Sequence, residues 1–305
     1  MISIVIPLYN KAATVERTLR SILKQTVRDY EVIVVDNGST DGGERIVRQI
    51  NDTRIRLINQ DKQGVSAARN KGIEESKYEW VAFLDADDEW ESTFLETVLK
   101  LAEKYKECDV CATAYYRCAK DGQKQEILLN STKESKDFVF DNYFEVASQS
   151  DPPIHSSSIM AKKSALISIG GFPQGVHQGE DLLTWARLAS KYKIAYCREP
   201  QSIFYTGEEN AMGKPKRIPD PEDPVGKGLE AIYNDNPSLP GIKNYIAHWH
   251  KMRASIYLRL PGCSSKSRSE AQTSCRWHRN KKMVFYIILS FVPYKLRMNI
   301  LKKLN

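Results

Sequence analysis

Three carboxylates stand together in the segment Phe83-Leu-Asp-Ala-Asp-Asp88, directly after a predicted buried strand. Carboxylates this close repel one another unless a cation neutralises them. Hard divalent cations such as Mg²⁺ and Mn²⁺ bind to one or two carboxylates together with substrate phosphates. Asp85 and Asp87 are therefore candidate metal ligands, and the alternative is an acidic turn that caps the next helix.

Polar residues also follow two other predicted strands. Asp36 ends the second strand, where its carboxylate could accept a hydrogen bond from a base N–H or a ribose hydroxyl. Pro7, Tyr9 and Asn10 follow the first strand, and the Tyr9 ring could stack on a base. A plain turn or a helix cap is the alternative for each. No G-x-G-x-x-G or G-K-[ST] pattern follows this strand, which argues against a dinucleotide dehydrogenase and a P-loop enzyme.

A fourth candidate is the start of a predicted helix, where Glu180 and Asp181 follow Gly179. A carboxylate at a helix start is often only a favourable partner for the helix dipole. A general base that deprotonates a hydroxyl would also be a carboxylate. Trp185 lies four residues after Asp181 and projects from nearly the same face. It could stack on a sugar ring or pack in the core.

The first hundred residues alternate between strands and helices, which predicts parallel βαβ units. In such a sheet the loops after the strands meet at one edge, and ligands bind there. The predicted strands are 2–8, 30–35, 55–58 and 80–84, and the predicted helices 11–25, 41–50, 65–75 and 94–105. Further strands are predicted at 110–117, 125–129, 154–161 and 194–197, a helix at 182–192, a loop at 207–240 and helical spacing from 242 onward.

Six ordered motifs resemble those of family 2 glycosyltransferases of the GT-A fold, over roughly residues 1–210. They lie at residues 3–10, 34–41, 64–72, 83–88, 170–172 and 179–181. The resemblance implies an α/β fold with a Rossmann-like, mostly parallel central sheet and flanking helices. The helical spacing from 242 onward adds a helical C-terminal extension to this fold. The resemblance divides the matching region into a nucleotide-sugar-binding half (1–106) and an acceptor-binding half with the catalytic base (107–210). Composition and charge add a linker or loop (211–240) and a basic helical tail (241–305).

The resemblance also implies a reaction. A sugar would move with inversion from a nucleoside-diphosphate sugar, with a UDP-sugar preferred, to a hydroxyl of a glycan or lipid-linked glycan during surface polysaccharide synthesis. The cofactor would be Mn²⁺ or Mg²⁺, held by Asp87 and Asp85, and Asp181 would be the catalytic base. The implied donor-binding residues are Pro7, Tyr9, Asn10, Asp36, Gly64, Arg69, Asn70 and Asp85. The implied acceptor-binding residues are Gly171, Glu180 and Trp185.

The chain departs from the family pattern after its last predicted strand. Many relatives have a basic or His-bearing stretch there, whereas residues 204–210 contain no His. A third protein ligand for the metal is therefore open. His155 or His177 could take this place, or either could be a structural or acceptor-loop residue.

The charge of the 305-residue chain is uneven. The formal net charge is +7. Residues 241–305 contribute +13 and residues 1–240 contribute −6. The tail predicts either helices packed on the body or attachment to an anionic membrane surface through residues 279–305. No recognition-helix pattern accompanies the charge, which argues against nucleic acid.

The sequence starts without a basic leader and has no apolar run of about 20 residues, the length that spans a bilayer. The six cysteines are expected to be reduced thiols. We therefore expect a cytoplasmic protein, peripheral at the inner membrane face. Two alternatives to a glycosyltransferase remain open: a sugar nucleotidyltransferase and a catalytically silent sugar- or nucleotide-binding module. The first would need a basic phosphate-binding loop after strand one, for which Lys11 alone is poor support.

Overall fold

The computed structural model describes residues 1–61, 64–131, 133, 135–206, 218–279 and 281–304. It divides into two compact units. One is an α/β unit formed by Met1–Asp141 and Ser150–Tyr205. The other is a helical unit formed by Asn142–Gln149 and Thr206–Asn305.

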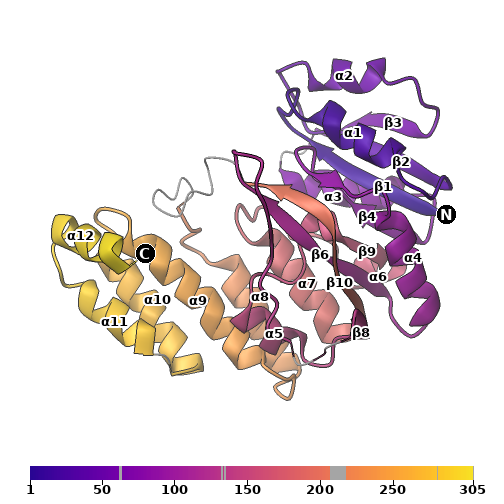
Figure 1. Ribbon diagram of the computed structural model, residues 1–305. Coiled ribbons are helices and arrows are strands. Elements are labelled where there is room, and N and C mark those ends of the chain that lie inside the picture. Colours follow the sequence, from indigo (N-terminus) through magenta and orange to yellow (C-terminus); the bar gives the residue numbers. More distant parts are fainter. Residues whose placement is uncertain (62–63, 132, 134, 207–217, 280, 305) are drawn as a thin grey trace. The chain divides into compact units, whose positions relative to one another are not determined.

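The α/β unit is built on one mixed sheet with the strand order β3-β2-β1-β4-β9-β6-β10-β5 (Figure 1). Strand β7 pairs with β6, and β8 pairs with β10. The strands are β1 (Ile2–Leu8), β2 (Tyr30–Asp36), β3 (Ile55–Asn59), β4 (Trp80–Phe83), β5 (Glu89–Trp90), β6 (Val110–Cys118), β7 (Lys124–Glu126), β8 (Asp137–Val139), β9 (Ile159–Lys162) and β10 (Ile194–Tyr205).

The four N-terminal strands are parallel, as the alternation of strands and helices predicts. Ile2 pairs with Tyr30 of β2 on one side and with Trp80 of β4 on the other. The crossover helices are α1 (Val15–Leu23), α2 (Gly43–Gln49) and α3 (Val65–Glu75). The strand order reverses between β1 and β4, so a topological switch point lies beside the ends of these two strands.

Helices cover both faces of this sheet, because its strands have no polar side. Ile4 and Ile6 of β1 pack with α1, α2 and α4 (Phe94–Lys104). On the opposite face, Ile33 and Val35 of β2 pack on Ala68 of α3. Helix α3 lies close to β1: an added Cβ on Gly72 would stand 2.2 Å from Val5 Cγ1.

The second half of the sheet departs from the parallel prediction. Strand β9 lies between β4 and β6 and is antiparallel to both. It is also shorter than the strand predicted at 154–161, because the turn η1 (Ser156–Ser158) precedes it and His155 caps that turn. Helix α6 (Lys163–Ser168) follows β9, and α7 (Glu180–Lys191) leads to β10.

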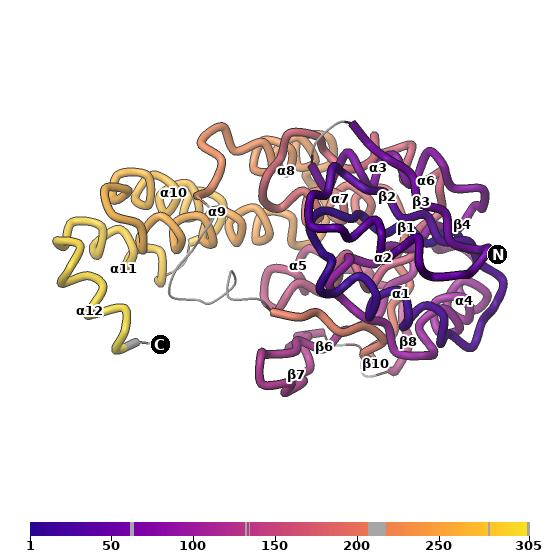
Figure 2. The backbone as a smooth tube through the Cα atoms, turned by 90° about the horizontal axis from the view of Figure 1, so that it is seen from above, coloured from indigo at the N-terminus to yellow at the C-terminus, as the bar shows by residue number. Residues whose placement is uncertain are grey.

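The helical unit has a core of its own. Ala254 and Leu258 of α9 pack with Ala271 of α10 and with Met283 and Leu289 of α11. Figure 2 shows α9 and α10 side by side. The helices are α5 (Tyr143–Gln149), α8 (Pro224–Asp235), α9 (Ile242–Leu258), α10 (Ser264–Trp277), α11 (Lys281–Leu289) and α12 (Tyr294–Leu304).

Helix α8 lies in a segment whose composition predicts a loop. Pro224 occupies the first helical turn, where its missing N–H costs nothing, and the Asp223 side chain accepts a hydrogen bond from Gly226 N. Proline and aspartate here begin a helix and do not break one. None of the described helices is both long and apolar enough to cross a bilayer. All six cysteines are free thiols.

Candidate functional site

The loops after β1, β2 and β3 are tied together at the carboxyl edge of the sheet. Asn37 N donates to Leu8 O at 2.9 Å, and Gly64 N donates to Asn37 Oδ1 at 2.7 Å. Gly64 has a φ of 107° at the start of α3, a conformation that side-chain-bearing residues rarely adopt. The predicted donor-pocket residues on these loops are therefore neighbours in space.

Asn10 and Asp36 shape this edge through short polar contacts. Asn10 Oδ1 accepts from Thr40 N at 2.9 Å, and Asn10 has a positive φ of 51°. Asp36 is buried, and its Oδ1 accepts from Ser39 N at 3.1 Å. Tyr9 is 59% exposed beside them, which leaves its ring free to stack on a planar group.

Arg69 is the buried cation of the site. Its Nη2 lies 2.7 Å from Asp85 Oδ1 and its Nη1 lies 3.3 Å from Glu180 Oε1. Burial opposes its charge, but the carboxylates of Asp85 and Glu180 outweigh this and hold the pKa of Arg69 above its ordinary value. The guanidinium therefore connects the end of β4 with the start of α7.

Asp85, Asp88 and His155 form a compact cluster whose candidate ligand atoms all lie within 4.8 Å of one another. Asp88 accepts from Ser157 Oγ at 2.6 Å and from Tyr205 N at 3.2 Å. Burial, followed by the negative charges of Asp85 and Asp87, raises the pKa of Asp88 well above its usual range. Burial also acts to raise the pKa of Asp85, but the positive charge of Arg69 outweighs it and lowers that pKa.

His155 is a neutral ligand candidate. Burial is the main cause that lowers its pKa to about 4. Its Nδ1 accepts a hydrogen bond from Ser157 N at 3.2 Å, so this nitrogen carries no proton. Its ring is fixed between the aromatic rings of Tyr115 and Phe204. The sequence names His155 and His177 as alternatives for a third ligand, and only His155 lies in the cluster with Asp85 and Asp88.

Asp87, the expected metal ligand, points elsewhere in this structure. Its carboxylate lies 2.5 Å from Lys11 Nζ, and both side chains are partly exposed. Asp88, the third acid of the motif, is the one that joins Asp85. The role of Asp87 in metal binding stays a prediction.

The cluster fits a divalent cation. It offers two carboxylates and a neutral imidazole, and the pKa of Asp88 is raised by burial and then by the negative charges of Asp85 and Asp87, which a bound cation would offset. Carboxylate oxygens suit Mg²⁺ and Mn²⁺, and imidazole is a common ligand of transition metals.

Asp181 lies in the first turn of α7, which begins after Gly179 with a φ of 80°. Burial, followed by the neighbouring charge of Glu180, raises the pKa of Asp181 to about 7. The negative charges of Asp85 and Asp181 also act on the same Arg69 guanidinium. A carboxylate with this pKa can take a proton near neutral pH.

The Asn70 side chain forms two hydrogen bonds with the backbone of the motif at residues 170–172. Asn70 Nδ2 donates to Phe172 O, and Phe172 N donates to Asn70 Oδ1, both at 2.8 Å. Gly171 leaves room for this pair, because an added Cβ would stand 2.5 Å from Asn70 Oδ1. Gly171 therefore lies beside the predicted donor-pocket residue Asn70.

Trp185 and His177, two of the candidate residues from the sequence, do not face the candidate site. The Trp185 ring is fully buried against Phe83 and Phe172, so we assign it a packing role in place of the expected stacking on an acceptor sugar. His177 is exposed, and no contact places it in the Asp85 cluster. Of the segment 204–210, residues 207–210 lie outside the described part of the chain.

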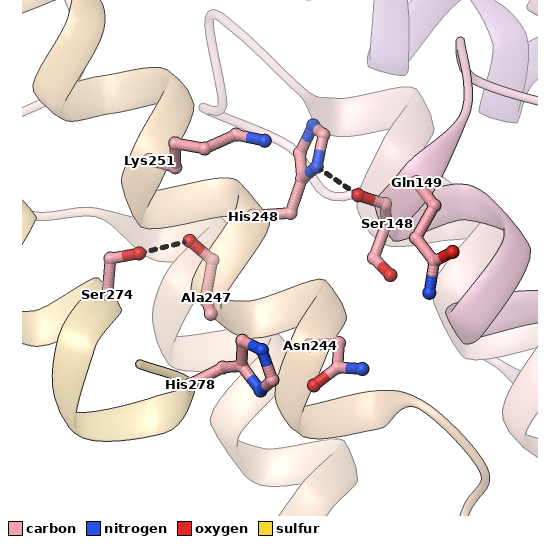
Figure 3. A pocket seen from close by; sticks show the side chains of 8 residues that line it. All are labelled: Ser148, Gln149, Asn244, Ala247, His248, Lys251, Ser274 and His278. Atoms are coloured by element: carbon pink, nitrogen blue, oxygen red, sulfur yellow. Dashed lines mark hydrogen bonds between the residues drawn. The ribbon is translucent and has the colours of Figure 1, made fainter. Parts of the chain in front are cut away.

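The helical unit contains a cavity of about 260 Å³ with a different chemistry (Figure 3). As far as the structure describes its lining, no carboxylate faces it, so it does not offer a site for Mg²⁺ or Mn²⁺. His248 Nδ1 lies 2.6 Å from Ser148 O at its edge. The lining residues are Ser148, Gln149, Asn244, Ala247, His248, Lys251, Ser274 and His278.

An open α/β sheet with carboxylates at its switch point defines a class of proteins that bind ligands beyond the carboxyl ends of their strands. Solved structures make this class more specific. The structure of S. aureus TarS 1-349 in complex with UDP-GlcNAc superimposes with a TM-score of 0.64 at 16% identity, covering 99% of this chain and 91% of that one. The mannosyltransferase PcManGT from Pyrobaculum calidifontis, in complex with GDP-Man and Mn²⁺, gives a TM-score of 0.61 at 19% identity, covering 98% and 86%.

Sequence comparison identifies the family. The model of Glycosyl transferase family 2 matches residues 3–166. The putative teichuronic acid biosynthesis glycosyltransferase TuaG of Bacillus subtilis is 36% identical over 199 residues, which are 64% of this chain and 75% of TuaG. An uncharacterized glycosyltransferase of Rickettsia bellii is 31% identical over 218 residues, 71% of this chain. The matched region is about a third of the length of the Rickettsia relatives.

The chain therefore belongs to glycosyl transferase family 2. Its fold is that of the GT-A glycosyltransferases, with several C-terminal helices added.

Proposed function

We propose that this protein is an inverting glycosyltransferase. It moves a sugar from a nucleoside-diphosphate sugar to a hydroxyl of a glycan or lipid-linked glycan acceptor in surface polysaccharide synthesis. The observation that carries the proposal is the position of Arg69, which pairs with Asp85 on the donor side and contacts Glu180 beside the candidate base Asp181. The proposed donor site and the proposed catalytic base therefore both adjoin the buried guanidinium of Arg69.

The donor is proposed to bind along the carboxyl ends of β1, β2 and β4. Tyr9 would stack on the base and Asp36 would accept its N–H. Uracil and thymine present the same N–H, so a UDP-sugar is the preferred donor. Support comes from the solved relatives, whose complexes contain UDP, UDP-GlcNAc or GDP-Man. Pro7, Asn10, Gly64, Arg69, Asn70 and Asp85 complete the proposed donor site.

A Mn²⁺ or Mg²⁺ ion is proposed as the cofactor, and PcManGT was solved with Mn²⁺. Asp85 and Asp87 are its ligands by family resemblance, and Asp85, Asp88 and His155 by geometry. When bound, the cation would stabilise the charge of the departing diphosphate. Asp85 belongs to both proposed ligand sets, and Arg69 orients its carboxylate through a hydrogen bond.

Asp181 is proposed to accept the proton of the acceptor hydroxyl. The acceptor oxygen then attacks the anomeric carbon from the face opposite the nucleoside diphosphate, which leaves, and the configuration of that carbon is inverted. Its pKa of about 7 matches this task, because a base is most effective when it is largely unprotonated yet still basic at working pH. Burial and then the charge of Glu180 keep the pKa of Asp181 high. Gly171 and Glu180 are proposed to border the acceptor.

The enzyme is proposed to work in the cytoplasm, peripherally at the inner membrane face. Its six free thiols agree with a reducing compartment. The relative TuaG carries a putative role in teichuronic acid biosynthesis, which supports a polysaccharide acceptor.

The test is a transfer assay with a panel of UDP-, GDP- and dTDP-sugars and Mn²⁺. We expect release of a nucleoside diphosphate, whereas release of pyrophosphate would identify a nucleotidyltransferase and overturn the proposal. Binding of a donor without turnover would identify a silent binding module.

Two conservative changes separate the proposed metal ligands. Asp88→Asn and Asp87→Asn are compared by calorimetric titration with Mn²⁺, with the exposed Asp29→Asn as the matched control. Weakened binding only in Asp88→Asn supports the geometric set, and weakened binding only in Asp87→Asn supports the set from family resemblance. Unchanged Mn²⁺ affinity in both would overturn the metal site.

A further inference from the structure

Helix α11 is apolar on two sides, yet only one side packs in the helical unit. Met283, Tyr286 and Leu289 are buried in the core of that unit. Val284, Phe285 and Ile288 face away from that core and are exposed. An exposed apolar surface of this kind marks a contact with a membrane or with another protein.

The exposed apolar residues are close together in the chain, on α11, in the turn after it and at the start of α12. Positions 281, 284, 285 and 288 are spaced by one, three or four residues, which places them on one face of α11, and Phe291 follows in the turn after this helix. Phe291 is 67% exposed, and Arg268 lies over its ring at 3.7 Å, which holds the ring in place. Leu296 of α12 is also exposed.

The charge around this surface has one sign. Lys281, Lys282 and Lys295 are exposed beside the apolar side chains, and Lys302 and Lys303 follow on α12. The last acidic residue of the chain is Glu270, and it is engaged by His250 and Arg253. A second copy that met this one through the same face would place lysine against lysine with no acid on that face to compensate. A surface of anionic lipid matches both the charge and the apolar side chains.

We propose that the exposed face of α11 and the start of α12 bind the surface of an anionic bilayer. The inference deepens the membrane location in the proposed function by assigning the residues that make the contact. Val284, Phe285, Ile288, Phe291 and Leu296 enter the boundary between headgroups and acyl chains. Lys281, Lys282 and Lys295 contact the lipid phosphates.

Flotation with vesicles of phosphatidylcholine, with and without phosphatidylglycerol, tests the proposal on the full chain. The wild type is expected to float with the anionic vesicles and to be released by salt. The variant Ile288→Ser/Phe291→Ser is expected to bind at least tenfold more weakly. Both side chains are exposed, so folding is retained, as circular dichroism would verify. Ile167→Ser is the matched control, since Ile167 is 61% exposed on the α/β unit, against 60% for Ile288.

Variants that reverse the charge of lysines test the electrostatic contribution to vesicle binding. Lys281→Glu/Lys295→Glu is expected to lose binding to anionic vesicles, whereas Lys24→Glu/Lys227→Glu, with the same change of net charge, keeps it. Equal binding by wild type and Ile288→Ser/Phe291→Ser would overturn the proposal, as would a dimer of the wild type that this variant converts to a monomer. Turnover of a water-soluble acceptor is measured in parallel. It should be unchanged in all these variants, so a failed membrane contact is distinguished from a failed transferase assignment.

Discussion

The Arg69 guanidinium lies 2.7 Å from Asp85 Oδ1 and 3.3 Å from Glu180 Oε1, so one buried cation connects the end of β4 with the start of α7. The Asp85 carboxylate, a candidate metal ligand, and the turn that carries Asp181 are thereby held relative to each other. Removal of this cation would leave two carboxylates close together in a poorly solvated place.

Replacement of Arg69 by Met should therefore reduce the free energy of unfolding by about 3–5 kcal/mol, because it leaves uncompensated buried charges. Arg69→Lys should recover part of this loss, since one ammonium cannot match both contacts of the guanidinium. Urea unfolding measures the change. Arg20→Met is the control, because Arg20 forms an exposed pair with Glu16. Similar midpoints for Arg69→Met and Arg20→Met would contradict the bridging role.

The rate should depend on pH through Asp181. A base must be unprotonated, and its pKa is about 7, so kcat/KM should rise tenfold per pH unit below 7 and level off above it. Asp181→Asn should lower kcat by about 10²- to 10⁴-fold and abolish this limb. The pH profile of both proteins provides the measurement. A limb centred near pH 4 would show that a different group controls the rate.

The raised pKa of Asp181 should make the rate rise with pH but make the folded state less stable as pH rises. In the folded chain Asp181 binds its proton up to about pH 7, whereas an ordinary aspartate loses it near 3.8, so the folded state binds more protons between these values. Stability from this group therefore falls as pH rises from about 4 to 7. Asp181→Asn should be more stable than the wild type at pH 8 and similar to it at pH 4. Thermal unfolding at both pH values would show whether the difference is present.

Replacement of Gly171 by alanine is expected to be more damaging than the same replacement of its neighbour Gly170. Both have a positive φ, 66° and 80°, so an alanine at either position costs about 1–2 kcal/mol. Only at Gly171 would the new Cβ collide with Asn70 Oδ1, at 2.5 Å. Gly171→Ala should therefore lose additional stability and weaken donor binding through Asn70. Equal losses of stability and of donor affinity in both variants would count against this contact.

Gly72 and Val5 should be energetically coupled. A Cβ on Gly72 would stand 2.2 Å from Val5 Cγ1, so Gly72→Ala should cost about 1–3 kcal/mol through overpacking. Val5→Ala removes the obstructing methyl groups, so the double variant should lose less than the sum of the two single losses. Strict additivity in a double-mutant cycle of denaturant unfolding would refute the close packing of α3 on β1.

Much of the parallel half of the sheet is predictable from local pattern. The apolar runs at β1 and β2 have no polar face, and helix α3 spans the predicted residues 65–75. The start of α2 is less predictable from the sequence: the helix predicted at 41–50 begins at Gly43, after the cap residue Gly42. The polar side chains that precede it do not cap the helix, because Ser39 Oγ donates to Asp36 Oδ1 and Thr40 Oγ1 donates to Asn10 Oδ1.

By itself, the sequence determined which residue types stand after each strand, because strand ends and turns follow from nearby apolar and polar residues. The tertiary structure decided which of these residues meet. It placed Asp88 and His155 with Asp85, paired Asp87 with Lys11 and buried Trp185 against Phe83. Those choices depend on β9 entering the sheet antiparallel and on the rotamers that the packed neighbours allow. Both are set by contacts between residues far apart in the chain, which local periodicity does not encode.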